Sequence, residues 1–210
     1  MMENIIEKIR GFTMVTQKRL ENLINLSNRV IEDTIPGDFV ECGTCRGGSA
    51  ALLAYIAKEE GWKRNVWLFD SFQGHPVPMD NTAPDRAIMH EWAGTMIASE
   101  ADVKLALRTL DVYVEQQVKI IPGWFQETLP IAGINEIALV HIDCDWYESI
   151  LCCLTHLYPK VMSGGYIIVD DYSYSDTPGV KIAVDQFFAQ RENVIAETFF
   201  VNPAKIFKIK

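Results

Sequence analysis

The spacing of apolar positions divides the chain into helices and short strands. Residues 14–33 carry apolar side chains at intervals of three and four, separated by charged and amide residues, which predicts an amphipathic helix ended by "IPG". Residues 50–61, "AALLAYIAKEEG", predict a second helix that ends at Gly61. Ser99 with Asp102 resembles a capping box and predicts the start of a third helix. Two more helices are predicted over 148–161 and 180–191.

Short apolar runs between these helices predict buried strands. The five runs are "DFVEC" (38–42), "VWLFD" (66–70), "VKIIPGW" (118–124), "IALVHID" (137–143) and "YIIVDD" (166–171). Apolar strands that alternate with helices predict a parallel sheet covered on both faces. The tail over 197–210 alternates like an antiparallel hairpin that closes the sheet. A chain of 210 residues has the length of one domain, so we expect a single domain over 1–210 that begins with a helical segment over 1–35.

The stretch from 71 to 100 lacks this periodicity. It contains three prolines and two glycines, and no regular apolar spacing continues through it. A loop of this length inside a compact domain is typical of a lid or of a disordered segment. We predict that 71–100 is a lid that also forms part of the surface that binds a ligand.

Charged residues and glycines lie at the carboxyl end of every predicted strand of the parallel sheet. Ligands of such sheets bind outside the carboxyl ends of the strands. The residues at these ends are Glu41, Gly43, Asp70, Gly123, Asp143, Asp170 and Asp171. We therefore expect a ligand site along this edge of the sheet.

The turn after the first strand, "ECGTCRGGS", contains Gly43, Gly47 and Gly48, which let the backbone turn tightly and approach a ligand. The spacing is not G-x-G-x-x-G, so the dinucleotide fingerprint is not met, and a tight turn without a ligand is the alternative. Asp70 ends the second strand, where an acidic residue of nucleotide-binding sheets accepts hydrogen bonds from ribose hydroxyls. A capping or turn role is the alternative for Asp70. Together the two features indicate a nucleoside-containing small molecule.

Carboxylates follow the fourth and fifth strands at Asp143, Asp145, Asp170 and Asp171. Carboxyl groups that lie this close together are difficult to ionise at the same time unless a cation is present. Oxygen ligands favour a hard cation such as Mg²⁺ or Ca²⁺. Capping of the following helices would explain one or two of the four aspartates. We expect His141 to be a packed core residue rather than a metal ligand.

Composition narrows the class of function. The formal net charge of −9 argues against a nucleic-acid partner, because phosphate binding rests on clustered lysine and arginine. No apolar run approaches the roughly 20 residues of a membrane span, and the N-terminus lacks the features of a secretory signal, so we expect a cytoplasmic protein without a membrane partner.

Five cysteines, an odd number, suit a reducing compartment. Cys42 and Cys45 form a C-x-x-C inside the glycine turn, where neither redox nor zinc chemistry is expected.

Five distinctive segments lie in order within roughly residues 36–190: "GDFVECGTCRGGSA", "VWLFDSFQG", "GWFQETLP", "HIDCDWYES" and "LYPKVMSGGYIIVDDY". Together they resemble the macrocin O-methyltransferase family. The resemblance implies a Rossmann-like class I methyltransferase fold with a mostly parallel seven-stranded sheet, helices on both faces and a C-terminal antiparallel hairpin. It also implies an S-adenosylmethionine-dependent enzyme that methylates sugar hydroxyls. A more distant similarity to catechol-type O-methyltransferases lies in Glu41, Gly43, Gly47 and Ser49.

The resemblance implies roles for residues at each strand end. The methionine part of the cofactor would be surrounded by Glu41, Gly43, Thr44, Gly47, Gly48 and Ser49, the ribose held by Asp70 with Ser71, and the adenine lined by Gly123, Trp124, Phe125 and Gln126. Mg²⁺ would be bound by Asp143, Asp170 and Asp171, with Asp143 also bordering the cofactor, and would lower the pKa of the acceptor hydroxyl.

The identity of the catalytic base is left open. Catechol-type enzymes carry a lysine three residues after the first metal aspartate, and this chain has Trp146 there. Asp145 is our first choice of base, because it is not needed as a ligand. The sequence also fits the reverse assignment, with Asp143 as base and Asp145 on the metal.

The sequence therefore predicts a Mg²⁺-dependent O-methyltransferase that acts on a sugar hydroxyl of a glycosylated small molecule or a glycan. One alternative is methylation of a catechol or another phenol. A second alternative is a binding or scaffold protein that keeps the fold and the cofactor pocket without catalysis. The resemblance also implies a homo-oligomer, and it does not transfer the identity of the acceptor.

Overall fold

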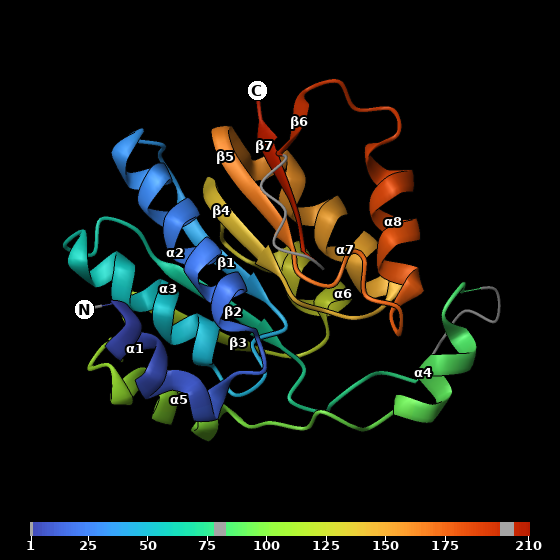
Figure 1. Cartoon of the computed structure of the whole chain (residues 1–210), viewed down its shortest axis with the longest axis horizontal. Coiled ribbons are helices and arrows are strands. Elements are labelled where there is room, and N and C mark those ends of the chain that lie inside the picture. Colours follow the sequence, from blue (N-terminus) through green and yellow to red (C-terminus); the bar gives the residue numbers. More distant parts are fainter. Residues whose placement is uncertain (1, 78–82, 198–203) are drawn as a thin grey trace.

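Seven strands form one sheet through the middle of the molecule (Figure 1). The computed structural model describes residues 2–77, 83–197 and 204–210, and within them the strand order is β3-β2-β1-β4-β5-β7-β6. The strands are β1 (Asp38–Cys42), β2 (Val66–Asp70), β3 (Val118–Pro122), β4 (Ile137–Ile142), β5 (Val161–Val169), β6 (Val194–Glu197) and β7 (Lys205–Ile209). Strands β1 to β5 pair in parallel, and β7 runs antiparallel to both β5 and β6. The predicted sheet and its closing antiparallel pair are confirmed, while the predicted hairpin residues 198–203 lie outside the described part.

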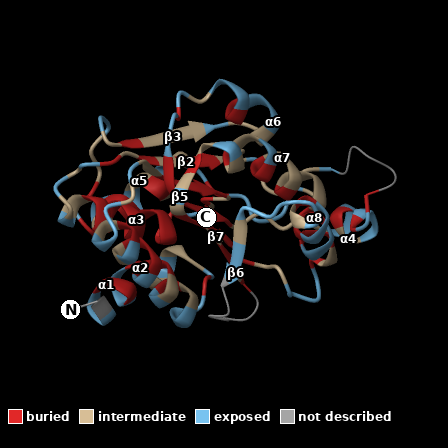
Figure 2. Cartoon of the chain, turned by 90° about the horizontal axis from the view of Figure 1, so that it is seen from above, coloured by how far each residue is buried: buried red, intermediate tan, exposed pale blue. Residues whose placement is uncertain are grey.

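Helices cover both faces of this sheet (Figure 1). One face carries α1 (Met2–Ile9), η1 (Arg10–Phe12), α2 (Gln17–Glu32), α3 (Gly48–Glu59) and α5 (Glu100–Thr109). The other carries α6 (Phe125–Thr128), η2 (Leu129–Ile131), α7 (Tyr147–Leu157), η3 (Tyr158–Lys160) and α8 (Pro178–Phe188). Successive strand residues enter opposite cores, as Leu139 and Val140 of β4 do. Figure 2 shows the buried residues concentrated between these layers, which explains why the strands read as continuous apolar runs.

The helices that the apolar spacing predicts are present. Helices α2, α3, α7 and α8 overlap their predicted ranges, and α5 begins with the predicted capping box, in which Asp102 N donates to Ser99 Oγ over 3.2 Å. Gly61 follows α3 with a positive φ of 82°, as expected for a glycine that ends a helix. The N-terminal helix α2 packs against α3 and across β4 and β5. Within the described residues, no helix combines the length and the apolar character that crossing a bilayer requires.

Residues 71–77 and 83–99, which we call the insertion, reach away from the sheet and carry helix α4 (Arg86–Trp92) (Figure 1). The spacing of apolar residues did not predict α4. The two legs of the insertion are joined by backbone hydrogen bonds of 2.9 Å from His75 N to Thr95 O and from Gly94 N to His75 O. Residues 78–82, which belong to the predicted lid, lie outside the described part.

A buried carboxylate ties the insertion to the helices on the second face. Asp85 is 1% exposed, and its Oδ2 accepts a hydrogen bond of 2.7 Å from the backbone N–H of Tyr147, the first residue of α7. Gly179 of α8 lies against the same carboxylate, because a Cβ at this position would come within 1.8 Å of Asp85 Oδ2. Helix α4 accordingly lies beside α8 in Figure 2. The described part of the insertion is therefore docked on α7 and α8.

Candidate active site

The strand ends that the sequence singles out meet along one edge of the sheet. The backbone hydrogen bonds that join neighbouring strands continue past their last residues, since each first loop residue still donates to the adjacent strand. These bonds, each 2.9 Å long, run from Gly43 N to Phe69 O, from Asp143 N to Cys42 O, from Asp170 N to Ile142 O and from Gly123 N to Asp70 O. The register of the parallel strands thus brings the four loops together.

The glycines of the turn after β1 make close contacts with other parts of the chain. A Cβ on Gly43, which has a φ of 88°, would lie 1.9 Å from the backbone oxygen of Asp143. Gly47 has the same φ and is the N-cap residue directly before α3, and a Cβ there would lie 2.8 Å from Cα of Val103. Gly48 leaves room for Thr13 of the N-terminal segment, which a Cβ would approach to 2.6 Å. Packing within the protein therefore already requires these glycines, beyond any need to approach a ligand.

Asp70 organises the loops on either side of the β2 end. Its Oδ2 accepts a hydrogen bond of 2.7 Å from Cys45 N in the glycine turn, and its Oδ1 accepts one of 2.8 Å from Phe72 N. Ser71 Oγ donates to Gly74 O over 3.3 Å. Each carboxylate oxygen of Asp70 has lone pairs left for another donor. The turn role that the sequence left as an alternative is therefore present.

Residues after β3 complete the neighbouring part of this edge. Gly123 has a φ of 135° and is bonded to Asp70, as above. Trp124 stands at the start of the short helix α6, and its backbone oxygen accepts a hydrogen bond of 3.0 Å from Thr128 Oγ1. Trp124 and Phe125 are partly buried, and Gln126 is exposed. The residues predicted to line the adenine are thus adjacent to Asp70, which is predicted to hold the ribose.

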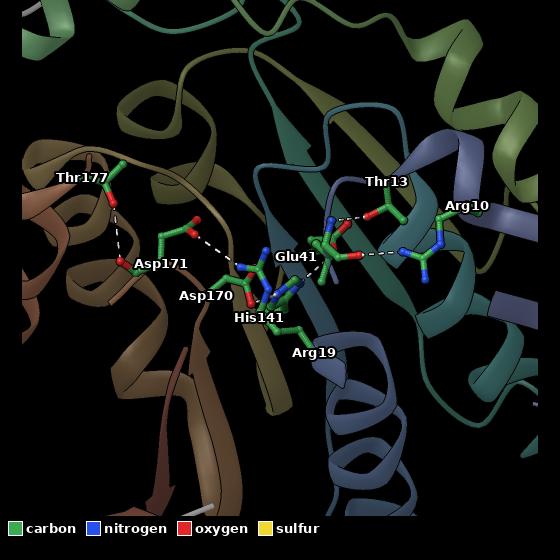
Figure 3. Close-up of polar contacts among 9 residues, drawn as sticks. Arg10, Thr13, Arg19, Glu41, His141, Asp170, Asp171 and Thr177 are labelled. Carbon is green, nitrogen blue, oxygen red and sulfur yellow. Dashed lines mark hydrogen bonds and ion pairs between the residues drawn. The ribbon is translucent and has the colours of Figure 1, made fainter. Parts of the chain in front are cut away.

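A buried histidine connects β1 to β5. His141 is 2% exposed, and its Nδ1 lies 2.9 Å from Glu41 Oε1, while its Nε2 lies 3.7 Å from Asp170 Oδ1 (Figure 3). Burial alone would lower the pKa of His141, but the adjacent carboxylates of Asp170 and Glu41 raise that pKa well above its ordinary range, so the ring is a cation. His141 is buried as predicted, but it lies between two carboxylates rather than among apolar side chains.

Arg19 of α2 faces the aspartates that follow β5. Its guanidinium Nη1 lies 2.5 Å from Asp170 Oδ2 and 3.3 Å from Asp171 Oδ1 (Figure 3). Burial alone would raise the pKa of Asp170, but the neighbouring His141 and the Arg19 charge lower that pKa below its ordinary value. Asp170 is therefore a buried carboxylate that two cations keep ionised.

Asp143 and Asp171 experience the opposite balance of charges. Burial and then the charges of Asp170 and Asp171 raise the pKa of Asp143 well above its ordinary range. Burial and the charges of Asp170 and Asp145 raise the pKa of Asp171 to about 6. Among the described residues, atoms of His141, Asp143 and Asp170 that could each ligate a metal lie within 4.8 Å of one another. The cluster has the donor atoms and the negative charge of a cation site.

Asp145 points toward the insertion instead. Its Oδ2 lies 2.8 Å from Nε2 of His75, and the side chains of Asp145 and His75 are 24% and 11% exposed. Trp146, the next residue, is 1% exposed and lies edge-on to His75 and to Trp92 of α4, with ring centroids 5.0 and 6.0 Å apart. Trp146 occupies the position at which catechol-type enzymes carry a lysine, and its ring packs against the insertion.

Comparison with known proteins identifies the family. The model of the macrocin-O-methyltransferase (TylF) family matches residues 8–202, which is most of the chain. The chain belongs to this family. It is therefore an O-methyltransferase, and the resemblance seen in its five sequence segments is confirmed.

Individual relatives are O-methyltransferases named for natural products. The demethyldecarbamoylnovobiocin O-methyltransferase of Streptomyces niveus is 43% identical to this chain over 181 residues, which are 85% of this chain and 68% of the relative. The mycinamicin III 3''-O-methyltransferase of Micromonospora griseorubida is 36% identical over 182 residues, 83% of this chain and 69% of the relative. The solved structure of the O-methyltransferase NovP matches this chain with a TM-score of 0.87 and 39% sequence identity. The match covers 95% of this chain and 82% of the NovP chain. The fold of the family is thus the fold described above.

Three residues near the site were not predicted from the sequence. Arg19, His75 and Asp85 each contact the strand-end region from a segment that is distant along the chain. Asp85 carried a helix-capping signal, an acidic residue one position before a helix, but no helix was expected to follow it. Arg19 and His75 carried no local signal, because only the tertiary structure determines their partners.

Proposed function

We propose that this O-methyltransferase transfers the methyl group of S-adenosylmethionine to a hydroxyl group of a sugar on a glycosylated small molecule, with a bound Mg²⁺ ion. The observation that carries this proposal is the close approach of the Asp143 and Asp170 carboxylates at the strand ends, next to the glycine turn. Family membership supplies methyl transfer, and this geometry supports a cation beside the cofactor pocket.

The chemistry of the acidic cluster fits a divalent cation. It contains four carboxyl groups and two basic groups, those of Glu41, Asp143, Asp170, Asp171, Arg19 and His141. With every carboxyl group ionised and His141 protonated, two negative charges remain, which one divalent cation balances. The raised pKa of Asp143 has the same origin, because without a cation its charge is unfavourable. Asp143, Asp170 and Asp171 would hold Mg²⁺, since a hard cation prefers carboxylate oxygens to a protonated imidazole.

The glycine-turn side of the site fits S-adenosylmethionine. Glu41 Oε2 is buried and has no hydrogen-bond partner among the described residues, so it is available to accept from the amino group of the methionine part. The other residues that would surround this part are Gly43, Thr44, Gly47, Gly48 and Ser49. Asp70 with Ser71 would hold the ribose, and Gly123 to Gln126 would line the adenine.

The reaction needs a base, an aligned acceptor oxygen and the exclusion of water. When bound, Mg²⁺ supplies positive charge that lowers the pKa of the acceptor hydroxyl. Asp145 accepts the hydroxyl proton as the acceptor oxygen forms a bond to the methyl carbon, and the carbon–sulfur bond breaks with its electron pair remaining on sulfur. The rings of Trp146 and Trp92 pack on His75, the partner of Asp145, and the side chain of Asp145 is 24% exposed, which limits the water around it.

The choice of a sugar hydroxyl rests on the relatives and on Trp146. One relative is named for a substrate that carries a sugar. It is the 4'-O-methyltransferase that acts on a rhamnosyl-tetracenomycin in Streptomyces olivaceus, which is 38% identical over 164 residues (77% of this chain, 62% of the relative). Catechol-type enzymes use a lysine where this chain has Trp146. Both observations favour the sugar over a phenol.

A methyl-transfer screen tests the proposal. Isotope-labelled S-adenosylmethionine with Mg²⁺ would be offered with glycosylated natural products, nucleotide sugars, oligosaccharides and catechols, starting with demethyldecarbamoylnovobiocin. We expect label in one glycosylated acceptor, and its loss when EDTA removes the metal. Transfer to catechols alone would overturn the sugar assignment, and full activity in EDTA would overturn the metal. Absence of S-adenosylmethionine binding in calorimetry would reject the whole proposal.

A further inference from the structure

We propose that His75, supplied by the insertion, is a positioning residue for Asp145 and fixes the direction in which Asp145 meets the acceptor hydroxyl. This inference rests on the proposed role of Asp145 as the base. It assigns to the insertion a part in catalysis in addition to a part in forming the acceptor surface.

The contact between the two side chains is short and shielded from water. His75 Nε2 lies 2.8 Å from Asp145 Oδ2, and both side chains are at most one quarter exposed, at 11% and 24%. Hydrogen bonds between groups this poorly solvated are stronger than those at an open surface. Within the described residues, Oδ1 of Asp145 makes no hydrogen bond. His75 therefore engages one carboxylate oxygen and leaves the other for the acceptor.

Both the backbone and the imidazole of His75 contact the opposite leg of the insertion. Its backbone N–H and C=O are both bonded to the opposite leg of the insertion, at Thr95 and Gly94. Its Nδ1 lies 3.3 Å from Thr95 Oγ1, and that hydroxyl donates its proton to Trp92 O over 2.6 Å. The contact with Thr95 Oγ1 limits the rotation of the imidazole and keeps Nε2 facing Asp145.

Two aromatic rings complete the support of His75. The ring of Trp92 is stacked on the imidazole, with centroids 5.8 Å apart and planes 18° apart. The ring of Trp146 meets the imidazole edge-on at 5.0 Å and 78°. Trp146 directly follows Asp145 in the chain, so the same contact also restrains the loop that carries the carboxylate. A side chain fixed by packing and by a second hydrogen bond can orient a reacting group accurately.

The attachment of α4 extends this support to the body of the protein. Trp92 is the last residue of α4, and the residue before that helix is Asp85, whose carboxylate caps α7. Helix α7 begins two residues after Asp145. The insertion and the Asp145 loop are therefore anchored to the same helix terminus. Among the described residues, Asp145 has no other hydrogen-bond partner. His75 is therefore the residue that orients its carboxylate.

Two substitutions at position 75 separate orientation from packing. His75→Phe keeps an aromatic ring between Trp92 and Trp146 but has no hydrogen-bond donor. His75→Gln loses the ring but keeps an amide nitrogen near the position of Nε2. We expect His75→Phe to lower kcat by about 10-fold to 100-fold, with the KM for S-adenosylmethionine unchanged, because loss of an orienting partner has effects of this size. His75→Gln should recover most of kcat. His90→Gln, at an exposed histidine of α4, is the matched control and should retain wild-type rates.

The opposite order of rates, with His75→Phe active and His75→Gln impaired, would show that the ring is needed only for packing and would overturn the inference. Equal rates for all variants would also overturn it. An inactive wild-type protein would instead reject the proposed function. A second readout needs no acceptor: in ¹⁵N-histidine-labelled protein, the imidazole signals lost in His75→Gln should shift in Asp145→Asn and not in Asp176→Asn. Signals unchanged in Asp145→Asn would contradict the contact.

Discussion

Asp143 and Asp145 are two residues apart but belong to different environments. Asp143 faces the strand-end cluster, where burial and the charges of Asp170 and Asp171 raise its pKa. Asp145 faces the insertion, where His75 binds one of its oxygens. The first environment is built by the register of parallel strands, and the second by a segment that follows a different strand. Two adjacent carboxylates can therefore take different roles because different parts of the fold position them.

Asp170→Asn should produce the largest effect, since it removes a charge at the centre of the cluster. We expect methyl transfer to fall by about 10³-fold, because a metal ligand contributes several kcal/mol of transition-state stabilisation. The affinity for S-adenosylmethionine, measured by calorimetry, should change little. Transfer at the wild-type rate would mean that the strand-end cluster has no part in the reaction.

Asp145→Asn should have the next largest effect, and through a different step. The amide cannot accept the hydroxyl proton, so we expect kcat to fall by about 10²-fold, within the usual range for a general base. Because the ligand set is untouched, the concentration of Mg²⁺ that gives half-maximal rate should not change. An increased Mg²⁺ requirement in this variant would indicate that Asp145 binds the cation.

Gly43→Ala should damage the Asp143 side through its backbone. The added Cβ would lie 1.9 Å from the Asp143 oxygen, whereas at Gly61, which has a similar φ, a Cβ meets nothing within 4 Å. We expect Gly61→Ala to cost about 1 kcal/mol of unfolding free energy for its backbone conformation alone, and Gly43→Ala about 2 kcal/mol more for the clash. Urea denaturation measures both. Equal losses would mean that the two strand ends are not in tight contact.

Asp85→Asn tests the insertion side and should have the smallest effect. Burial raises the pKa of Asp85 above its ordinary value of 3.8. A raised folded-state pKa favours folding of the protonated form, so wild-type stability should decline relative to Asp85→Asn as the pH rises above about 4. Urea denaturation of both proteins between pH 4 and pH 7 gives this difference. A difference that does not change with pH would place the carboxylate in water.

The strand-end cluster could be predicted because its causes are local and periodic. The apolar runs set the strands, and parallel pairing then brings Asp143 and Asp170 to one edge, whatever the loops do. The capping box of Ser99 with Asp102 was predicted for the same reason, since both of its partners lie within one turn.

The insertion side could not be predicted in this way. His75 meets Asp145 across 70 residues, and Arg19 meets Asp170 across 151, and neither pair follows from spacing. Helix α4 is only seven residues long and lies in a proline-rich stretch, so its apolar pattern is too short to be distinctive. The sequence predicted that the glycine turn lets the backbone approach a ligand. Its close contacts with Asp143, Val103 and Thr13 became evident only from the fold.

Binding of Mn²⁺ in place of Mg²⁺, followed by electron paramagnetic resonance, tests most directly whether the two aspartates have different roles. Wild-type protein, Asp143→Asn and Asp145→Asn would be titrated under the same conditions, without an acceptor. We predict one bound ion in the wild type, the same affinity in Asp145→Asn, and binding at least about 10-fold weaker in Asp143→Asn. Loss of binding in Asp145→Asn with binding retained in Asp143→Asn would contradict the account.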